Sequence, residues 1–252
     1  MTTPDRPNTP DLRAITEARL TDGPRGRAVS TSTALAFALD HARAREAVTS
    51  ELDLPRIRAA LSKAGLATCT VTSAAAHRAT FITRPDLGRI LPPDAGAQLA
   101  PHGPADVAIV LGDGLSAVAA ILNGPAFCMA LAQALRGQGL TVAPIVIAQQ
   151  ARVALGDGIA LAMQAQTVVM ALGERPGLSA SDSLGVYITH QPTAQTADSG
   201  RNCLSNIRAG GLQVADAATQ ACALILAMRK LGQSGVALST ARSKTAQLPP
   251  DS

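Results

Sequence analysis

DVAIVLGDGLS, at residues 106–116, places a short run rich in β-branched residues directly before a glycine-rich turn. Two further apolar runs follow, TVAPIVIA at 141–148 and TVVMAL at 167–172, and each is preceded by a stretch of helical character. The first of these helical stretches is expected to be interrupted at 123–125, where Asn-Gly-Pro stands. Apolar strands that alternate with helices indicate βαβ units and a parallel sheet buried on both faces.

The sheet is expected to end with GVYITHQP at 185–192, an edge strand that Pro192 closes. A polar loop over 193–206 then leads to a last long helix from about residue 214 to 231.

The residues before these strands have a different pattern. STSTALAFALDHARAREAVTSEL at 30–52 predicts a long helix that Ser30 or Ser32 can cap, and LPRIRAALSKAG at 54–65 predicts a second helix. ATCTVTSAA at 67–75 alternates like a strand. The stretch 91–105 is rich in Pro, Gly and Ala, which is typical of a domain boundary.

We therefore predict an α/β protein with a Rossmann-like parallel-sheet C-terminal domain at 101–236. A smaller, mainly helical N-terminal domain at 11–100 is expected to dock a partner through its helix surfaces. Residues 1–10 are expected to be a flexible terminus, and residues 237–252 a flexible tail.

Composition excludes several classes of protein. The 252 residues are 47% hydrophobic, 16% charged and only 2% aromatic, with a formal net charge of +4. So few aromatic rings and such scattered cations argue against nucleic-acid binding. No stretch approaches about 18 uninterrupted apolar residues, so no membrane span is expected. The four cysteines show no zinc-ligand or C-x-x-C spacing, which favours free thiols in the cytoplasm and no metal site.

A glycine pattern in the first turn raises one alternative. Gly112-x-Gly114-x-x-Ala117 fits the dinucleotide fingerprint between a strand and a helix, which would indicate an NAD-type oxidoreductase. The acidic residue that should follow the second strand is missing, and Asp113 would repel a pyrophosphate. LGDG also recurs at 155–158, where it opens a second helix, so a helix start used twice is the preferred explanation of both copies.

Two polar segments are candidate ligand contacts. GERPG at 173–177 follows an apolar strand, so Glu174 and Arg175 emerge where ligands bind in open α/β sheets, or else they pair to organise the loop. RNCLSNIRAGG at 201–211 is rich in hydrogen-bond donors around Cys203. Cys203 lacks an evident base, because the nearest histidine in sequence, His190, is expected on a strand facing solvent or an interface. We expect no catalytic residue on this chain.

The chain resembles the small (light) subunit family of ethanolamine ammonia-lyase, an adenosylcobalamin-dependent enzyme, over roughly residues 11–236. The resemblance rests on motifs in this order: DLRAITEARL, ALDHARAREAV, FITRPDLGRIL, VAIVLGDGLSA, APIVIAQQARVALGDGI, GERPGLSASDSLGVYITHQP and RNCLSNIRAGGL.

The resemblance implies a hetero-oligomer with a large subunit, which holds the substrate site and converts ethanolamine to acetaldehyde and ammonia by radical chemistry. It implies that residues 101–236 bind cobalamin, with Val153, Glu174 and Cys203 as the cofactor contacts. D-x-H-x-x-G, whose histidine ligates cobalt in many cobalamin proteins, is absent, so base-on binding without a histidine ligand is expected.

Two further expectations follow from this resemblance. A stand-alone cobalamin carrier is an alternative to the enzyme subunit. The chain begins almost directly at DLRAI, so cytoplasmic localisation is favoured over residence in a bacterial microcompartment, to which an extended leader directs some relatives.

Overall fold

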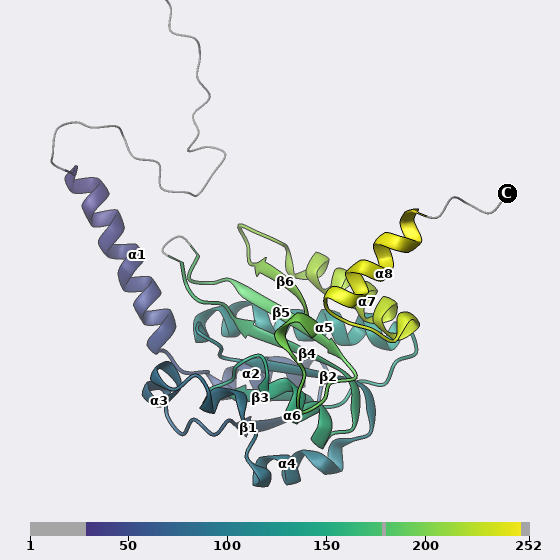
Figure 1. Ribbon diagram of the computed structural model, residues 1–252. Coiled ribbons are helices and arrows are strands. Elements are labelled where there is room, and N and C mark those ends of the chain that lie inside the picture. The colour runs from purple at the N-terminus through teal and green to yellow at the C-terminus, as the bar shows by residue number, and fades with distance from the viewer. Residues whose placement is uncertain (1–28, 178–179, 248–252) are drawn as a thin grey trace, which may run out of the picture.

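The computed structural model describes residues 29–177 and 180–247, with side chains up to residue 241, and it shows an α/β protein built on one six-stranded sheet (Figure 1). The order of the strands across this sheet is β1-β3-β2-β4-β5-β6. The predicted flexible start at 1–10 lies outside the described residues. In chain order the strands are β1 (Thr68–Thr72), β2 (Ala105–Gly112), β3 (Ile145–Gln149), β4 (Ala165–Gly173), β5 (Leu184–His190) and β6 (Asn202–Ile207).

Helices precede, connect and follow the strands. Short 3-10 helices, labelled η, occur in three of the connections among the described residues. The helices are α1 (Thr31–Thr49), α2 (Leu54–Lys63), α3 (Arg78–Thr83), η2 (Leu87–Arg89), α4 (Pro93–Leu99), η3 (Ala100–His102), α5 (Ala117–Gly137), α6 (Leu155–Ala162), η4 (Asp198–Gly200), α7 (Val214–Leu231) and α8 (Val236–Gln247).

The parallel sheet predicted from the apolar runs is confirmed for β1, β3, β2 and β4. It is wrong for β5 and β6, which are antiparallel to their neighbours, so the sheet is mixed. The short connection 174–183 explains the reversal, because a parallel return needs a crossover of a dozen or more residues. The closer likeness to Rossmann folds stays a prediction.

The edge of the sheet also differs from the expectation. The predicted strand at 185–192 exists as β5, but β6 lies outside it and forms the edge, within the segment expected to be a polar loop. Most residues of β6 are at least partly exposed, and only Ile207 is buried. A strand of this kind has no continuous apolar run and therefore escapes detection by that signal.

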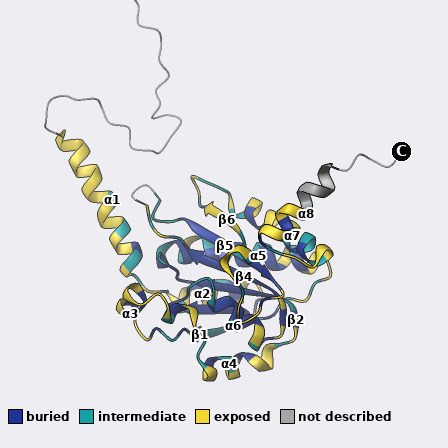
Figure 2. Cartoon of the chain, viewed as in Figure 1, coloured by how far each residue is buried: buried dark blue, intermediate teal, exposed yellow. Residues whose placement is uncertain are grey.

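Alternation along the strands divides the core into two layers. On one face Val107, Ile109 and Leu111 of β2 pack with α2, α5 and α7. On the other face Ala108 and Val110 pack with α4 and α6. Figure 2 shows that the strands are buried, whereas the outer surfaces of helices such as α4 and α7 are exposed. Such burial on both faces explains why these strands read as unbroken apolar runs.

The N-terminal range contributes to this same sheet. β1 pairs with β3 from Thr68 opposite Ile145 to Thr72 opposite Gln149, so residues on both sides of the predicted boundary share one sheet. The division at residue 100 into domains stays a prediction. At the other end α8 forms within the predicted flexible tail, and residues 248–252 lie outside the described range.

Helix α1 extends away from the sheet (Figure 1). Its predicted cap is confirmed, because the Ser30 side chain accepts a hydrogen bond from the N–H of Thr33 at 3.2 Å. Ala47 is its one buried residue, whereas Leu35 and Leu39 are 66% and 51% exposed. This helix therefore presents apolar side chains that the rest of the described chain leaves uncovered.

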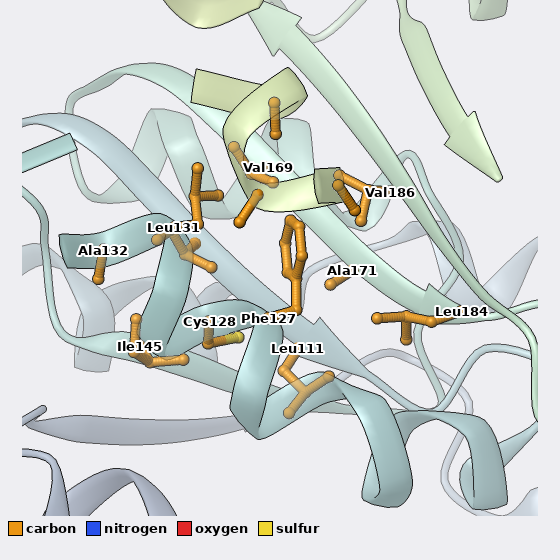
Figure 3. Packing of buried hydrophobic residues seen from close by; sticks show 14 of the residues in the cluster. Leu111, Phe127, Cys128, Leu131, Ala132, Ile145, Val169, Ala171, Leu184 and Val186 are labelled. Atoms are coloured by element: carbon orange, nitrogen blue, oxygen red, sulfur yellow. The ribbon is translucent and has the colours of Figure 1, made fainter. Parts of the chain in front are cut away.

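Helix α5 continues through the predicted interruption, with Pro125 inside it. Among the described residues it is the one helix long and apolar enough to cross a membrane. Its buried side chains, however, belong to the core: Figure 3 shows Phe127 within the cluster that includes Leu111 and Ala171 of the sheet. Packing against the sheet therefore overrides the helix-breaking tendency of the Gly-Pro pair.

We predict that Gly124→Ala destabilises the protein, although alanine is the better helix former. A Cβ at position 124 would lie 2.3 Å from Cδ1 of Leu111, which is fully buried. Overpacking of this kind costs about 1–3 kcal/mol of unfolding free energy, measurable by urea titration. In a Leu111→Ala background the added methyl group has room, so there the same change should cost little. Equal losses in both backgrounds would contradict the packing described.

Candidate functional site

The carboxylate of Asp113 lies in the turn after β2, and 1% of its side chain is exposed. It accepts hydrogen bonds from the backbone N–H groups of Gln150 and Ala151, both at 2.8 Å, and forms an ion pair with Arg78 at 3.1 Å. Arg78 also donates to the carbonyl oxygen of Gly114 at 2.9 Å. These bonds fix the turn after β2 to the loop that joins β3 to α6.

The glycines of the G-x-G-x-x-A pattern allow close packing of the same turn. Gly114 has a φ of +52°, and a Cβ there would lie 2.2 Å from the carbonyl oxygen of Gly173 at the end of β4. A Cβ on Gly112 would lie 2.6 Å from Leu172. Since Asp113 is buried among its own partners, these residues of the pattern have structural roles, and nothing here favours a dinucleotide site.

The second LGDG copy supplies another buried ion pair. Both carboxylate oxygens of Asp157, in the first turn of α6, accept hydrogen bonds from Arg201 at 2.7 and 2.6 Å. The side chains of Asp157 and Arg201 are 9% and 4% exposed, and the bonds to Asp157 raise the pKa of Arg201. Arg201 donates further to the Thr189 hydroxyl and to the carbonyl oxygen of Thr196. Each copy of the repeated motif thus supplies one aspartate, which forms an ion pair with an arginine far away in the sequence.

A cavity of about 420 Å³ lies beside the N-terminal end of α6. It is formed by the segment around α3 and η2, the loop between β3 and α6, strands β5 and β6, and the segment around η4. Val153 and Cys203, two of the three predicted cofactor contacts, line the same cavity. The full set of lining residues is Pro85, Arg89, Arg152, Val153, Tyr187, Asp198, Arg201 and Cys203.

Strand β5 contacts this region through alternate residues. Leu184, Val186 and Ile188 belong to the core on the α5 and α7 side. The residues between them point to the opposite face, because successive side chains alternate. There Tyr187 lines the cavity and Thr189 accepts a hydrogen bond from Arg201.

Glu174, the third predicted contact, lies next to the cavity and is not among the residues that line it. Its Oε2 accepts hydrogen bonds from the Ser183 hydroxyl and from the backbone N–H of Asn206, the latter at 3.2 Å. A Cβ on Gly185 would lie 2.8 Å from Oε1, so this glycine makes room for the carboxylate. Both hydrogen bonds go to Oε2, which leaves acceptor capacity on Oε1.

Tyr187 and Cys203 face each other across β5 and β6, in direct register. Partial burial, then the charge of Glu174, raise the pKa of the Cys203 thiol. Burial also raises the pKa of Tyr187 to about 12. His190 lies on a strand, as predicted, but its predicted orientation toward solvent is wrong: it is 8% exposed, and its Nδ1 lies 2.8 Å from the Thr167 hydroxyl. Because its pKa is raised, Cys203 is a neutral thiol in this site rather than an activated nucleophile.

Several lining residues were not singled out from the sequence. Arg89 pairs with Asp198 at 3.2 Å across the cavity, yet 109 residues separate them in the chain. Only the FITRPDLGRIL motif could have drawn attention to Arg89, and it gave no chemical role. In residues 29–177 and 180–247, no group of three His, Cys, Asp or Glu side chains is placed to hold a metal ion.

We predict that Asp113→Asn lowers the free energy of unfolding by about 3–5 kcal/mol, because it leaves Arg78 buried without its counter-charge. Urea titration measures this loss. Asp86→Asn is the matched control: its ion pair with Arg84 is exposed, and its loss should leave the urea midpoint unchanged. A similar effect of both substitutions would contradict the role given to the buried pair.

We also predict slow alkylation of Cys203 by iodoacetamide, because the thiolate is the reacting form and the pKa of this thiol is raised. Glu174→Gln removes a negative charge and lowers that pKa, so the rise of the alkylation rate should begin at lower pH. Mass spectrometry of the Cys203 peptide measures the rate at each pH. Asp216→Asn, on the exposed start of α7, should leave the profile in place. An unchanged profile in Glu174→Gln would show that its charge does not reach the thiol.

Comparison with known proteins identifies the family. The family model described as ethanolamine ammonia-lyase light chain (EutC) matches residues 7–239. A protein of Bradyrhizobium diazoefficiens is 45% identical over 241 residues, which cover 93% of this chain and 91% of the relative. Another, of Xanthomonas campestris pv. campestris, is 42% identical over 221 residues, with 86% and 81% covered. Both relatives are named ethanolamine ammonia-lyase small subunit. On this similarity, the chain belongs to the ethanolamine ammonia-lyase light chain family.

Proposed function

We propose that this chain is the small subunit of ethanolamine ammonia-lyase, a carbon–nitrogen lyase that converts ethanolamine to acetaldehyde and ammonia. The chain forms a hetero-oligomer with the large subunit, which carries the main part of the substrate site. The two subunits together bind adenosylcobalamin. Family membership and the names of the relatives support this proposal.

The observation that carries the proposal is the cavity in which Val153 and Cys203 come together. Cobalamin is a macrocycle with amide side chains and a phosphodiester in its nucleotide tail. The cavity offers apolar contact through Val153, the polar Tyr187 and Cys203, and arginine donors. A donor set of this kind fits an amphipathic ligand that carries amides and a phosphate.

The size of the cavity favours shared binding. About 420 Å³ is within the range of roughly 300–1,000 Å³ that encloses drug-sized ligands, and cobalamin is several times larger than those. One face of the cofactor would therefore lie against this chain and the rest against the large subunit. For the same reason we favour the enzyme subunit over a stand-alone carrier.

Each predicted contact has a role in binding. Val153 would pack against the cofactor, and Cys203 would contact it through its neutral thiol or its backbone. Glu174 would accept hydrogen bonds from amide groups through Oε1, since its Oε2 is already occupied. The radical chemistry would come from the bound adenosylcobalamin, and this chain would orient it and hold it in place. Base-on binding, without a histidine ligand from this chain, stays a prediction of the sequence.

Exposed apolar side chains on α1 support the predicted partner-docking role of residues 11–100. Leu35, Phe37 and Leu39 are 66%, 49% and 51% exposed, and contact with the large subunit would cover them. Cytoplasmic localisation, with a microcompartment as the alternative, stays a prediction of the sequence.

The test is co-expression of this chain with the large subunit, followed by addition of adenosylcobalamin and ethanolamine. Acetaldehyde should form only when both chains are present. Acetaldehyde formation by the large subunit alone at the same rate would contradict the proposal. Full-affinity cobalamin binding by this chain alone would instead favour the stand-alone carrier.

For Glu174→Gln we expect adenosylcobalamin to bind the two-chain complex about tenfold more weakly, because a charged acceptor becomes neutral while its shape is kept. Equilibrium dialysis with detection of the cobalamin absorbance measures the dissociation constant. Asp216→Asn removes a carboxylate from the exposed start of α7 and should leave this constant unchanged. Wild-type affinity in Glu174→Gln would rule out the carboxylate role.

A further inference from the structure

Arg152 differs from the other two arginines that line the cavity. Arg201 is paired with Asp157, and Arg89 is paired with Asp198. Within the described part of the chain, Arg152 has no carboxylate within ion-pair distance. Its Nε is buried without a hydrogen-bond partner, as is the Nε of Arg201, but only Arg201 has carboxylates beside its guanidinium. Buried donors in native proteins are nearly always satisfied, so the Nε of Arg152 points to a partner outside the chain.

The side chain of Arg152 is held in place by packing. Its guanidinium carbon lies 4.5 Å from the centre of the Phe81 ring, which is itself fully buried. Its backbone N–H donates to the carbonyl oxygen of Gly88 at 2.8 Å. A Cβ on Gly88 would lie 2.8 Å from Cγ of Arg152, so the glycine leaves space for this stem. The chain thus orients a cation without neutralising it.

Among the charged side chains that line the cavity, Arg152 alone has no partner of opposite charge, and the carboxylate of Glu174 beside the cavity is bonded to Ser183 and Asn206 instead. The pairs Arg89–Asp198 and Arg201–Asp157 each sum to zero, which leaves one positive charge on Arg152. Helix α6 begins at Leu155, so the positive end of its dipole lies close to the same position. Burial, then the nearby charge of Arg78, lower the pKa of Arg152, and the charge of Asp113 offsets part of this effect. A ligand group with one negative charge fits these surroundings.

We propose that Arg152 binds the phosphodiester of the nucleotide tail of the cofactor. This inference rests on the proposed function and deepens it. Among the groups of a cobalamin, the amides are neutral and the phosphodiester carries a single negative charge at neutral pH. A guanidinium binds phosphate oxygens through two parallel hydrogen bonds, which uses a planar cation as Arg152 presents it. Arg152 thereby selects corrinoids that carry a complete nucleotide tail.

The test compares two ligands on the complex of both subunits, with equilibrium dialysis and the corrinoid absorbance as the readout. Adenosylcobalamin has the phosphodiester, whereas adenosylcobinamide lacks the nucleotide tail. Arg152→Gln should weaken adenosylcobalamin binding about 10- to 100-fold and leave adenosylcobinamide binding unchanged. Arg152→Lys keeps the positive charge but lacks the planar guanidinium, so its affinity for adenosylcobalamin should lie between those of the wild type and Arg152→Gln.

Arg136→Gln, on the exposed last turn of α5, removes the same charge away from the cavity and should bind both ligands like the wild type. Equal weakening of both ligands by Arg152→Gln would overturn the inference. So would weaker association of the two subunits, measured by analytical ultracentrifugation, with unchanged cobalamin affinity, because Arg152 would then pair with the large subunit. If the wild-type complex bound neither corrinoid, the proposed function would fail, and this inference with it.

Discussion

The buried carboxylate of Asp113 joins segments that lie far apart in the sequence. It accepts two backbone N–H groups at the start of the loop between β3 and α6 and pairs with Arg78. Arg78 in turn donates to the carbonyl oxygen of Val48 at the end of α1. The loop that carries Arg152 and Val153 therefore has its conformation set from the centre of the molecule. A carboxylate buried to this degree is tolerated only because each of its oxygens is hydrogen-bonded.

The mixed sheet gives the candidate site its location. Because β5 returns antiparallel after a short connection, no crossover helix covers this face of β5 and β6. The face lines the cavity instead. Asp157 fixes Arg201 at this face, and the charge of Glu174 acts on Tyr187 and Cys203. The aromatic residues are few, yet Phe81 supports Arg152 and Tyr187 lines the cavity. In the proposed complex, small side chains and arginines of this face would contact the cofactor, and the large subunit would contact the rest of it.

Sequence reasoning found the elements that have a strong local signal. The unbroken apolar runs identified β2, β3 and β4, because strands buried on both faces need apolar residues at successive positions. It missed β6, which is polar and exposed at the edge, and it broke α5 at Pro125, where packing against Leu111 maintains the helix. Val153, Glu174 and Cys203 came from the family resemblance. The ion pairs of Asp113 and Asp157 and the packing of Arg152 on Phe81 depend on tertiary contacts between distant segments, which no local pattern encodes.

The central claim is that the cavity beside α6 is the face of this subunit that receives the cofactor. Hydrogen–deuterium exchange on the two-chain complex, with and without adenosylcobalamin, tests this claim most directly. The account predicts that the cofactor slows exchange in peptides covering residues 151–154 and 202–206. Exchange in the exposed last turn of α5 should be unchanged. Unchanged exchange at both of these segments, together with new protection elsewhere on this chain, would contradict it.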